Sequence, residues 1–342
     1  MRVLLLNDIQ SFSGAEVIFN SIAEELKRRG HETRRVVREE IPSLWGIVEE
    51  FKPDIIHQHN CTHIGAATLT FMRRFPSVQT FHDYWPICRC RDHFVDGKVC
   101  SLVDKDGGRC RACPNYLGAL RSPTFVKHMW GKDTHIVFTA VSEYTANKIM
   151  EFGYEEVIPI WNGIEIREDI HDSVDEGFVF VPAKADRAIK KGVHIIDAIA
   201  GQLPGVRFIH AGGGEAKNMK SVGLLSREEL WDYYKKCSMA IIPSIWEEPN
   251  GLPCEEAMMY GKVILGFKVG GIPEYIRHYV AGDPQEMKAL IEKLMGDPET
   301  RKALGEENRR VFLKYFTLEA MVNRYMEVYD RAIDRLKERG PK

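Results

Sequence analysis

The sequence predicts an α/β protein with two successive domains, each built on a parallel sheet that is covered by helices. Short apolar runs of strand length alternate with helical patterns, and this alternation is typical of parallel sheets. The alternation begins again in the second half of the chain. The length of 342 residues also exceeds a comfortable single core. We therefore expect two domains with a hinge near residues 159–168.

In the first half, a helical pattern with one apolar face covers Ala15–Arg29 and should end at Gly30. The polar run His57–Asn60 is expected to close the second strand. Ser142 precedes another apolar-periodic run and should be a helix N-cap. The strands themselves are expected at Val3–Leu6, Asp54–Ile56, Ser77–Phe81 and Ile136–Val141.

The second half repeats the pattern. Helices are expected over Leu230–Cys237 and Glu255–Tyr260, and a long helical pattern with interleaved charges runs from Leu318 to Arg339. The strands are expected at Phe178–Val181, Val206–Ala211, Met239–Ile242 and Val263–Phe267.

Charge and hydropathy exclude some classes of protein. Lysine and arginine number 47 against 49 acidic residues, so net charge does not favour nucleic-acid binding. No apolar run approaches the ~18–20 residues that cross a bilayer, and the short apolar start stops at Asn7 and Asp8. A secretory signal would need a longer apolar core. We therefore expect a cytoplasmic enzyme, with peripheral membrane contact left open.

Glycines follow two of the expected strands. Gly14 lies between the first strand and its helix, and Gly212-Gly213-Gly214-Glu215 follows a strand of the second half. Glycine lets a ligand approach the backbone, and a helix N-terminus favours negative charge. For the Gly14 motif alone a structural turn is the favoured interpretation, and a plain tight loop would give the same pattern at Gly212-Gly213-Gly214.

A more specific segment carries two carboxylates. Glu248 and Glu256 are separated by seven residues, with the first expected on a loop after a strand and the second in the following helix. Asn250, Gly251 and Leu252 would offer N–H groups to a phosphate where that helix begins. Carboxylates accept hydrogen bonds from the vicinal hydroxyls of a sugar or ribose. An acidic capping cluster is the alternative.

These motifs occur together in an order that resembles one family. Along almost its whole length the sequence resembles the family 4 retaining glycosyltransferases of the GT-B fold. The matching motifs are Gly14-Ala15-Glu16, Arg29-Gly30-His31-Glu32, Asp54-Ile55-Ile56-His57, Phe81-His82-Asp83, Trp161-Asn162-Gly163-Ile164, Lys191-Gly192, Gly212-Gly213-Gly214-Glu215, Glu248 to Glu256, and Gly270-Gly271-Ile272-Pro273-Glu274.

The resemblance implies a transferase that moves a sugar from a nucleotide-diphosphate sugar to a glycan, lipid-linked or small-molecule acceptor, with retention of anomeric configuration. It implies two Rossmann-like domains that face each other across a cleft. The N-terminal acceptor domain would span residues 1–165 and the C-terminal donor domain residues 166–317. A C-terminal helix, 318–342, would cross back to the N-terminal domain.

The resemblance also assigns roles to residues. Glu248 would contact the hydroxyls of the transferred sugar, and Glu256 the nucleotide ribose. His82 would reach the donor sugar, and Gly14 would approach the diphosphate. Lys191 would neutralise the charge of the leaving diphosphate, so no catalytic metal is expected. The other donor-binding residues on this basis are Gly213, Asn250, Gly251 and Leu252.

The sequence departs from the family pattern near this lysine. The family usually has a Gly-Arg pair several residues before its Lys-Gly, whereas this chain reads Pro182-Ala183-Lys184-Ala185-Asp186-Arg187. Either Lys184 or Arg187 would supply the second cation, and lysine lacks the bidentate fork of arginine.

Five of the eight cysteines lie in a polar insertion over residues 86–116. Cys110 and Cys113 have the spacing of a metal knuckle, and four thiolates bind zinc tetrahedrally. Some family members carry a similar insertion after a motif that resembles His82–Trp85. We expect a structural zinc, and the favoured ligands are Cys88, Cys100, Cys110 and Cys113, with Cys90 spare. An iron–sulfur cluster would use the same residues, and disulfides are disfavoured by a cytoplasmic location.

Two other functions remain as alternatives. A non-catalytic nucleotide-sugar-binding protein would keep the same scaffold, although the joint presence of Glu248, Glu256 and His82 disfavours it. A zinc-dependent nucleic-acid module would suit the cysteines but not the balanced charge.

Overall fold

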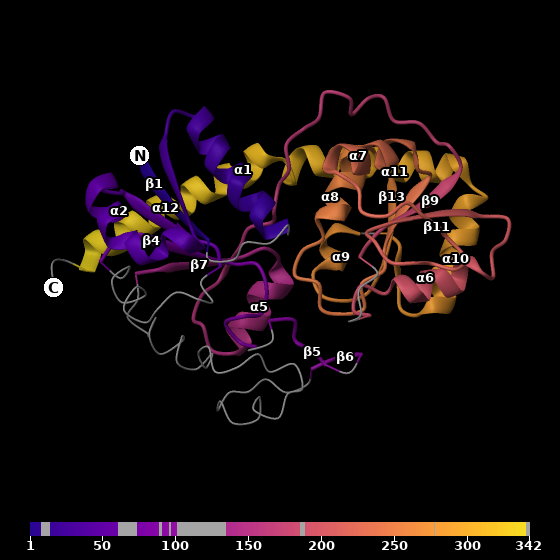
Figure 1. Ribbon diagram of the computed structural model, residues 1–342, viewed down its shortest axis with the longest axis horizontal. Helices are drawn as coiled ribbons and strands as arrows, with labels where there is room; N and C mark the ends of the chain where they lie inside the picture. The colour runs from indigo at the N-terminus through magenta and orange to yellow at the C-terminus, as the bar shows by residue number, and fades with distance from the viewer. Residues whose placement is uncertain are drawn as a thin grey trace. The chain divides into compact units, whose positions relative to one another are not determined.

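The computed structural model describes residues 1–7, 14–60, 74–88, 91–95, 97–100, 135–184, 189–276 and 278–339. The chain divides into two compact units, shown in Figure 1. The first comprises residues 1–95, 100–165 and 318–342, and the second residues 96–99 and 166–317. Each unit contains its own parallel sheet of six strands, as the sequence predicts.

In the first unit the strands follow the order β2-β1-β3-β4-β7-β8. The order of the strands in the sheet differs from their order in the chain, because β1 lies between β2 and β3. The strands are β1 (Arg2–Asn7), β2 (Glu32–Val37), β3 (Ile55–Gln58), β4 (Ser77–Phe81), β7 (Val137–Ala140) and β8 (Ile158–Pro159). Its helices are α1 (Gly14–Arg28), the 3-10 helix η1 (Arg38–Ser43), α2 (Leu44–Phe51), α5 (Glu143–Glu151) and α12 (Leu318–Arg339). Two short strands, β5 (Phe94–Val95) and β6 (Lys98–Val99), form a separate two-stranded sheet.

The local signals for helix ends are confirmed. The helix α1 is followed by Gly30, which has a φ of +81° and donates its N–H to the Lys27 carbonyl. The Ser142 hydroxyl accepts a hydrogen bond of 3.1 Å from the Thr145 N–H and so caps α5.

The end of the predicted strand Asp54–Ile56, which corresponds to β3, was predicted wrongly. His57 and Gln58 belong to β3 instead of closing it, and all four residues of the run His57–Asn60 are buried. A polar side chain can lie inside a strand of a covered sheet where hydrogen-bond partners are available. His57 has them, because Thr80 and Tyr329 bond to its two ring nitrogens.

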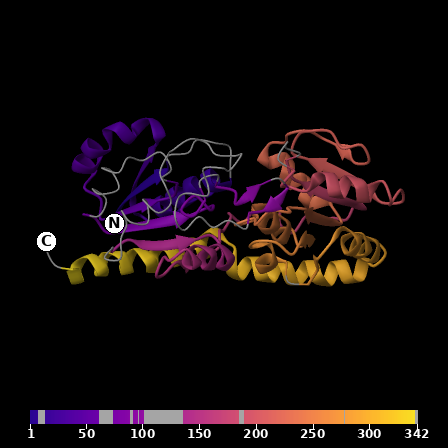
Figure 2. The ribbon, with the colours of Figure 1, turned by 90° about the horizontal axis from the view of Figure 1, so that it is seen from below.

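Helix α12 packs along the first sheet, next to α1 and β4 (Figures 1 and 2). Its bounds, Leu318–Arg339, are those of the predicted helical pattern. Tyr325 and Tyr329 are fully buried in this contact, and their hydroxyls reach Thr80 and His57.

In the second unit the strands follow the order β11-β10-β9-β12-β13-β14. This is the order of the doubly wound dinucleotide-binding fold, whose topological switch point lies between the first and fourth strands of the unit. The strands are β9 (Phe178–Pro182), β10 (Arg207–Ala211), β11 (Lys220–Ser221), β12 (Met239–Ile242), β13 (Val263–Phe267) and β14 (Val280–Ala281). The helices are α6 (Val193–Ala200), α7 (Arg227–Lys236), α8 (Leu252–Met259), α9 (Ile272–Tyr275), α10 (Pro284–Met295) and α11 (Pro298–Tyr315).

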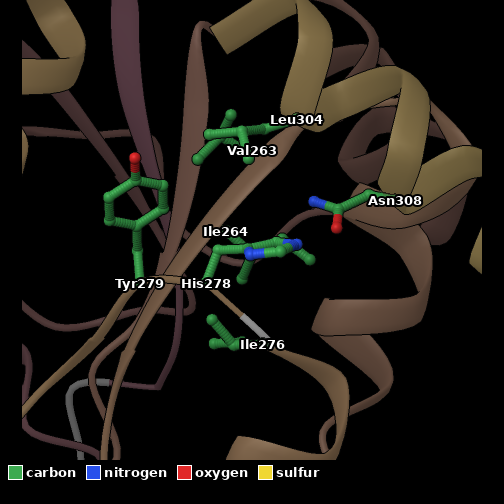
Figure 3. Close-up of a pocket in the computed structure, with 7 residues that line it drawn as sticks. All are labelled: Val263, Ile264, Ile276, His278, Tyr279, Leu304 and Asn308. Atoms are coloured by element: carbon green, nitrogen blue, oxygen red, sulfur yellow. The ribbon is translucent and has the colours of Figure 1, made fainter. Parts of the chain in front are cut away.

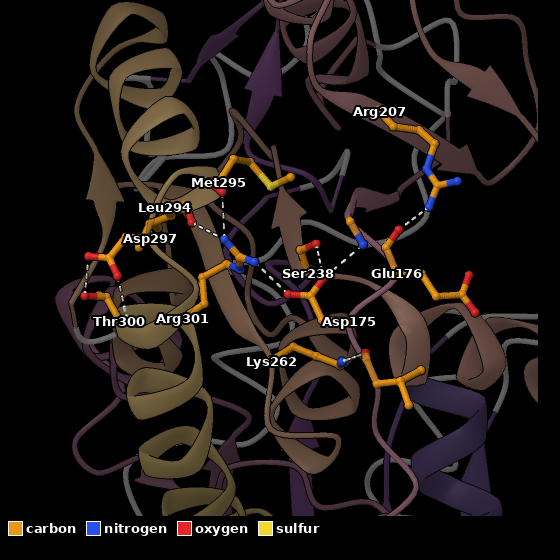
Figure 4. A network of polar contacts seen from close by, with 12 residues as sticks. Asp175, Glu176, Arg207, Ser238, Lys262, Leu294, Met295, Asp297, Thr300 and Arg301 are labelled. Atoms are coloured by element: carbon orange, nitrogen blue, oxygen red, sulfur yellow. Dashed lines mark hydrogen bonds and ion pairs between the residues drawn. The ribbon is translucent and has the colours of Figure 1, made fainter.

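A polar network ties the amino edge of the second sheet to helices α10 and α11 (Figure 4). The Arg301 guanidinium bonds the Asp175 carboxylate at 2.7 Å and the carbonyls of Leu294 and Met295 at the end of α10. Ser238, which precedes β12, also donates to Asp175. Asp175 precedes β9 and Ser238 precedes β12, so this network lies at the amino edge of the sheet. The network does not occupy the opposite, carboxyl edge.

Candidate functional site

The candidate site of the second unit lies at the carboxyl edge of its sheet. Lys184 follows β9, and the loop that carries Glu248 follows β12. These two strands are neighbours and flank the switch point, which is where ligands bind in open α/β sheets. The topology therefore places Lys184 and Glu248 at the same edge of the sheet, although 64 positions separate them in the sequence.

Glu248 is held by several donors. Its Oε2 atom accepts hydrogen bonds from the Lys191 ammonium at 2.7 Å, the Ser244 hydroxyl at 2.7 Å and the Trp246 indole N–H at 2.8 Å. The residue is only 7% exposed. Three donors on one oxygen fix the carboxylate in place, while Oε1 keeps its capacity to accept further hydrogen bonds.

A glycine turn supports the backbone of Glu248. Gly271 donates its N–H to the Glu248 carbonyl at 2.8 Å. Gly270 has a φ of +55°, and a Cβ atom there would lie 2.4 Å from the Glu248 nitrogen. Only glycine fits this position. The Gly270-Gly271 motif thus positions the loop that bears Glu248.

Glu256 lies in helix α8, as the sequence predicts, and is 7% exposed. Burial raises the pKa of its carboxyl, and the positive charge of Arg227 opposes the change. The Arg227 Nε atom lies 3.7 Å from Oε1 of Glu256. Arg227 begins helix α7 and was not among the predicted site residues.

The helix start near Asn250, where the sequence predicts N–H groups for a phosphate, also has internal side-chain contacts. Gly251 is the N-cap of α8 and Leu252 its first residue. The Asn250 amide, however, donates to Oε1 of Glu255 at 3.0 Å and to the Tyr275 hydroxyl. Its side chain therefore braces the loop internally.

Glu255 is a residue that the sequence analysis missed. It is 0% exposed, and its Oε2 atom has no hydrogen-bond partner among the described residues. Burial raises the pKa of this carboxyl to about 8, while the Asn250 hydrogen bond lowers it. The available signal was a second glutamate beside Glu256 in a helix with an otherwise apolar interior.

A pocket of about 340 Å³ opens beside Lys184 and Lys191. This volume falls in the range of pockets that take small ligands. Gly192 lies in its wall, and a Cβ atom there would meet the Pro243 carbonyl oxygen at 1.8 Å. The remaining walls come from Ile189, the start of α6, Asp197, Glu215 and Lys217. Gly213 is not among the lining residues; it has a φ of +77° in the loop after β10.

A second pocket of the same unit is too small to be a ligand site. Figure 3 shows it beside His278, Tyr279 and Asn308. Its volume is about 10 Å³, which is about the space of one water molecule. His278 pairs instead with the Glu307 carboxylate at 3.0 Å.

In the first unit, His82 directly follows β4 at the carboxyl edge of the sheet. Its Nε2 atom lies 2.8 Å from Nδ1 of His59. Burial and the charge of Arg91 lower the pKa of His82 to about 3, so the ring is neutral at neutral pH. Arg91 in turn donates to the Asp83 carboxylate at 3.0 Å.

Other predicted residues lie at the margin of the description or outside it. Gly14 is the first residue of α1. Arg187, Cys90, Cys110 and Cys113 lie outside the described residues. Cys88 is buried and Cys100 is partly buried. Within the described ranges, no three histidine, cysteine or acidic side chains form a group that could hold a metal.

Two family models match the chain. The model described as Glycosyltransferase Family 4 matches residues 33–168, and the model described as Glycosyl transferases group 1 matches residues 199–311. In the part of the chain that the structure describes, no helix is long and apolar enough to cross a membrane.

Curated relatives are similar at moderate identity. An uncharacterized glycosyltransferase of Methanocaldococcus jannaschii is 30% identical over 213 residues, which cover 57% of this chain and 59% of that protein. An MMP alpha-(1->4)-mannosyltransferase of Mycolicibacterium hassiacum is 23% identical over 309 residues, covering 83% of this chain and 72% of that protein.

Solved structures share the fold. A glycosyltransferase from Rickettsia africae matches with a TM-score of 0.72 at 13% identity, covering 97% of this chain and 98% of that one. Anabaena HepE in complex with UDP-glucose matches with a TM-score of 0.69 at 18% identity, covering 96% and 99%. WaaG, a glycosyltransferase involved in lipopolysaccharide biosynthesis, matches with a TM-score of 0.65 at 13% identity, covering 96% and 99%. The predicted GT-B class is confirmed by these neighbours and the two parallel sheets.

Proposed function

We propose that the chain transfers a sugar from a nucleotide-diphosphate sugar to an acceptor, as the matches to the Glycosyltransferase Family 4 and Glycosyl transferases group 1 models support. The observation that carries the proposal is the fixed carboxylate of Glu248 at the switch point of the second sheet. Glu256 lies in helix α8, which follows the loop that carries Glu248. A pocket with Lys184 and Lys191 opens at the same edge of the sheet. That HepE, with the same fold, is seen with UDP-glucose supports this class of donor.

The residues have separate roles in this proposal. Glu248 accepts hydrogen bonds from hydroxyls of the transferred sugar, and Glu256 accepts them from the ribose. The ammonium groups of Lys184 and Lys191 stabilise the negative charge that grows on the diphosphate as the glycosidic bond breaks. His82 donates a hydrogen bond to the donor sugar. Retention of anomeric configuration is part of the proposal and is supported by the family resemblance.

The acceptor is proposed to be a glycan or a lipid-linked molecule. The involvement of WaaG in lipopolysaccharide biosynthesis supports this class. Transfer assays with a panel of glycans and lipid-linked sugars would identify the acceptor, and co-sedimentation with anionic vesicles would test peripheral membrane contact. Turnover that survives excess EDTA would support chemistry without a divalent metal.

Variants of the two glutamates test the proposed roles. Glu256→Gln keeps the size and removes the charge, so affinity for the nucleoside diphosphate should fall ~10-fold or more. Glu248→Gln should leave that affinity nearly intact and lower turnover, because its partners belong to the transferred sugar. Calorimetry with UDP, GDP and ADP and donor-hydrolysis rates separate the two effects.

Exposed Glu299 provides the matched control, since Glu299→Gln removes a carboxylate remote from the switch point in sequence. Binding and turnover should match those of the parent protein. If Glu248→Gln and Glu256→Gln also behaved like the parent, the site assignment would be wrong. Nucleotide-sugar binding without any turnover across the panel would point instead to a non-catalytic binding protein.

A structural zinc at the cysteine insertion is a separate proposal. The residues proposed to hold it are Cys88, Cys100, Cys110 and Cys113, of which the first two lie in the described part of the chain. Protein purified without added metal should contain about one zinc per chain, as one tetrahedral site implies. Iron in place of zinc would indicate a cluster, and intramolecular disulfides without metal would contradict the proposal.

A further inference from the structure

His59 is a buried histidine whose ring touches His82. It follows strand β3, lies in the polar run 57–60 and is 0% exposed. Its Nδ1 atom is 2.8 Å from Nε2 of His82, and the two ring planes are 17° apart. At this distance one nitrogen must donate a proton and the other must accept it.

The second nitrogen of His59 decides which one donates. Its Nε2 atom is buried and has no hydrogen-bond partner among the described residues. A proton on Nε2 would leave an N–H donor buried without an acceptor, which is rarer in proteins than an under-satisfied acceptor. The proton of neutral His59 therefore belongs on Nδ1, where it has His82 as acceptor.

The surroundings prevent His59 from turning to another arrangement. The centroid of its ring lies 4.2 Å from that of His57 and 5.3 Å from that of Phe19. His57 is itself fixed, because Tyr329 and Thr80 bond to its two nitrogens at 2.8 and 2.7 Å. Helix α12 thus holds the histidine that packs against His59.

We propose that His59 is a positioning residue that fixes both the ring orientation and the tautomer of His82. Because Nε2 of His82 accepts a hydrogen bond from the Nδ1–H of His59, the ring proton of neutral His82 lies on its own Nδ1. That atom makes no hydrogen bond to the residues that the structure describes, so it is available as a donor to an oxygen atom of a ligand. The effect of His59 on catalysis rests on the sugar-transfer function proposed above.

Three variants of His59 separate donation from packing. In His59→Asn the amide lies close to the position of Nδ1 and can still donate to His82. In His59→Asp an ionised carboxylate can only accept, so the proton of His82 must move to Nε2. His59→Leu offers neither group. Thermal unfolding of each variant shows whether the fold is retained.

Nuclear magnetic resonance of ¹⁵N-histidine-labelled protein reads the tautomer without any substrate. Nδ1 of His82 should be the protonated nitrogen in the parent and in His59→Asn, and Nε2 in His59→Asp. Protonated Nε2 of His82 in the parent protein would overturn the proposal.

Kinetics then test the positioning role. Donor turnover should fall about 10-fold or more in His59→Asp and His59→Leu, and recover in His59→Asn. The nucleoside diphosphate affinity should stay within about twofold of the parent, since the loss affects one hydrogen bond to the sugar. Equal turnover in the parent and a folded His59→Leu variant would also overturn the proposal. An inactive parent that shows the expected tautomers would instead count against the sugar-transfer function.

Discussion

The Glu255 carboxyl is fully buried next to Glu256, yet only one of its oxygens has a partner in the described structure. Its neighbour Tyr275 is also buried. Burying a charged carboxylate is costly unless it is paired, so the group gains a proton instead. The two adjacent glutamates therefore differ in the roles that we propose for them: Glu256 binds the ribose, and Glu255 contributes to the interior.

This difference predicts a pH effect on stability. The pKa of Glu255 rises from its ordinary value to about 8 in the folded protein. The folded state then binds more protons than the unfolded state, so stability should fall as pH rises towards 8. Glu255→Gln should remove this loss and stabilise the protein by about 1 kcal/mol or more at pH 8. Urea denaturation at pH 5 and pH 8 measures it, and equal pH dependence in both proteins would contradict it.

A second residue-scale prediction concerns Gly270. In Gly270→Ala, the new Cβ atom would lie 2.4 Å from the nitrogen of Glu248, at a φ of +55°. The loop must move, and donor turnover should fall about 10-fold or more. Gly30→Ala is the control, because Gly30 has a φ of +81° but nothing within 4 Å. It should cost about 1 kcal/mol of stability and leave turnover unchanged. Equal turnover losses in the two variants would show that backbone strain alone is responsible.

At the scale of elements, the joint of helices α10 and α11 depends on Asp175. Its partner Arg301 has a side chain only 10% exposed. Burial would raise the pKa of Asp175, but hydrogen bonds from Ser238, Arg301 and the Gly177 N–H lower it. The stability that this carboxylate provides is thus present at neutral pH and is lost as pH falls through its lowered pKa.

Asp175→Asn should therefore destabilise the second unit by about 1 kcal/mol at pH 7, because it weakens a charged pair in which the Arg301 side chain is 10% exposed and that of Asp175 is 42% exposed. Glu307→Gln is the comparison, since its pair with His278 has side chains 40% and 44% exposed. That change should cost no more than about 0.5 kcal/mol. Chemical denaturation of both variants checks the difference, and similar costs would argue against a structural role for the network in Figure 4.

The elements also show what local sequence can predict. Strands β4, β12 and β13 are fully buried and were predicted with their observed bounds, and apolar residues dominate β12 and β13. Strand β2 was not predicted, because it lies at the edge of its sheet and buries only Val36. Edge strands lose the apolar pattern on which such predictions depend.

The candidate site was also predictable only in part, because some of its contacts join residues that are far apart in the sequence. The loop and helix positions of Glu248 and Glu256 follow from local patterns. The contact of Lys191 with Glu248 joins residues 57 positions apart, and the support from Gly270 also comes from another loop. Such contacts depend on the sheet order, which short sequence patterns do not encode.

At the scale of the whole molecule, the buried histidines of the first unit predict acid sensitivity. Burial lowers the pKa of His57 to about 3 and of His82 to about 3, and that of His59 well below its ordinary value. The unfolded chain binds these protons first as pH falls. The stability that these histidines contribute should therefore be complete above pH 6.5 and decline below it, by about 1 kcal/mol per pH unit for each histidine.

His57→Asn tests this expectation. It should lower stability at pH 7, because Tyr329 and Thr80 lose partners, and it should make the decline between pH 6.5 and 4 less steep. Urea denaturation at several pH values gives both quantities. A slope equal to that of the parent would show that His57 is not buried in its neutral form.

Helix α12 imposes an order on the folding of a newly made chain. The strands of the first sheet leave the ribosome early, but the tyrosines that bond His57 and Thr80 are translated only after the entire second unit. Until then the buried face under α12 remains open to water and to chaperones. The first unit is begun first and completed last, so a ribosome that stalls within residues 166–317 would leave an unfinished domain on the nascent chain.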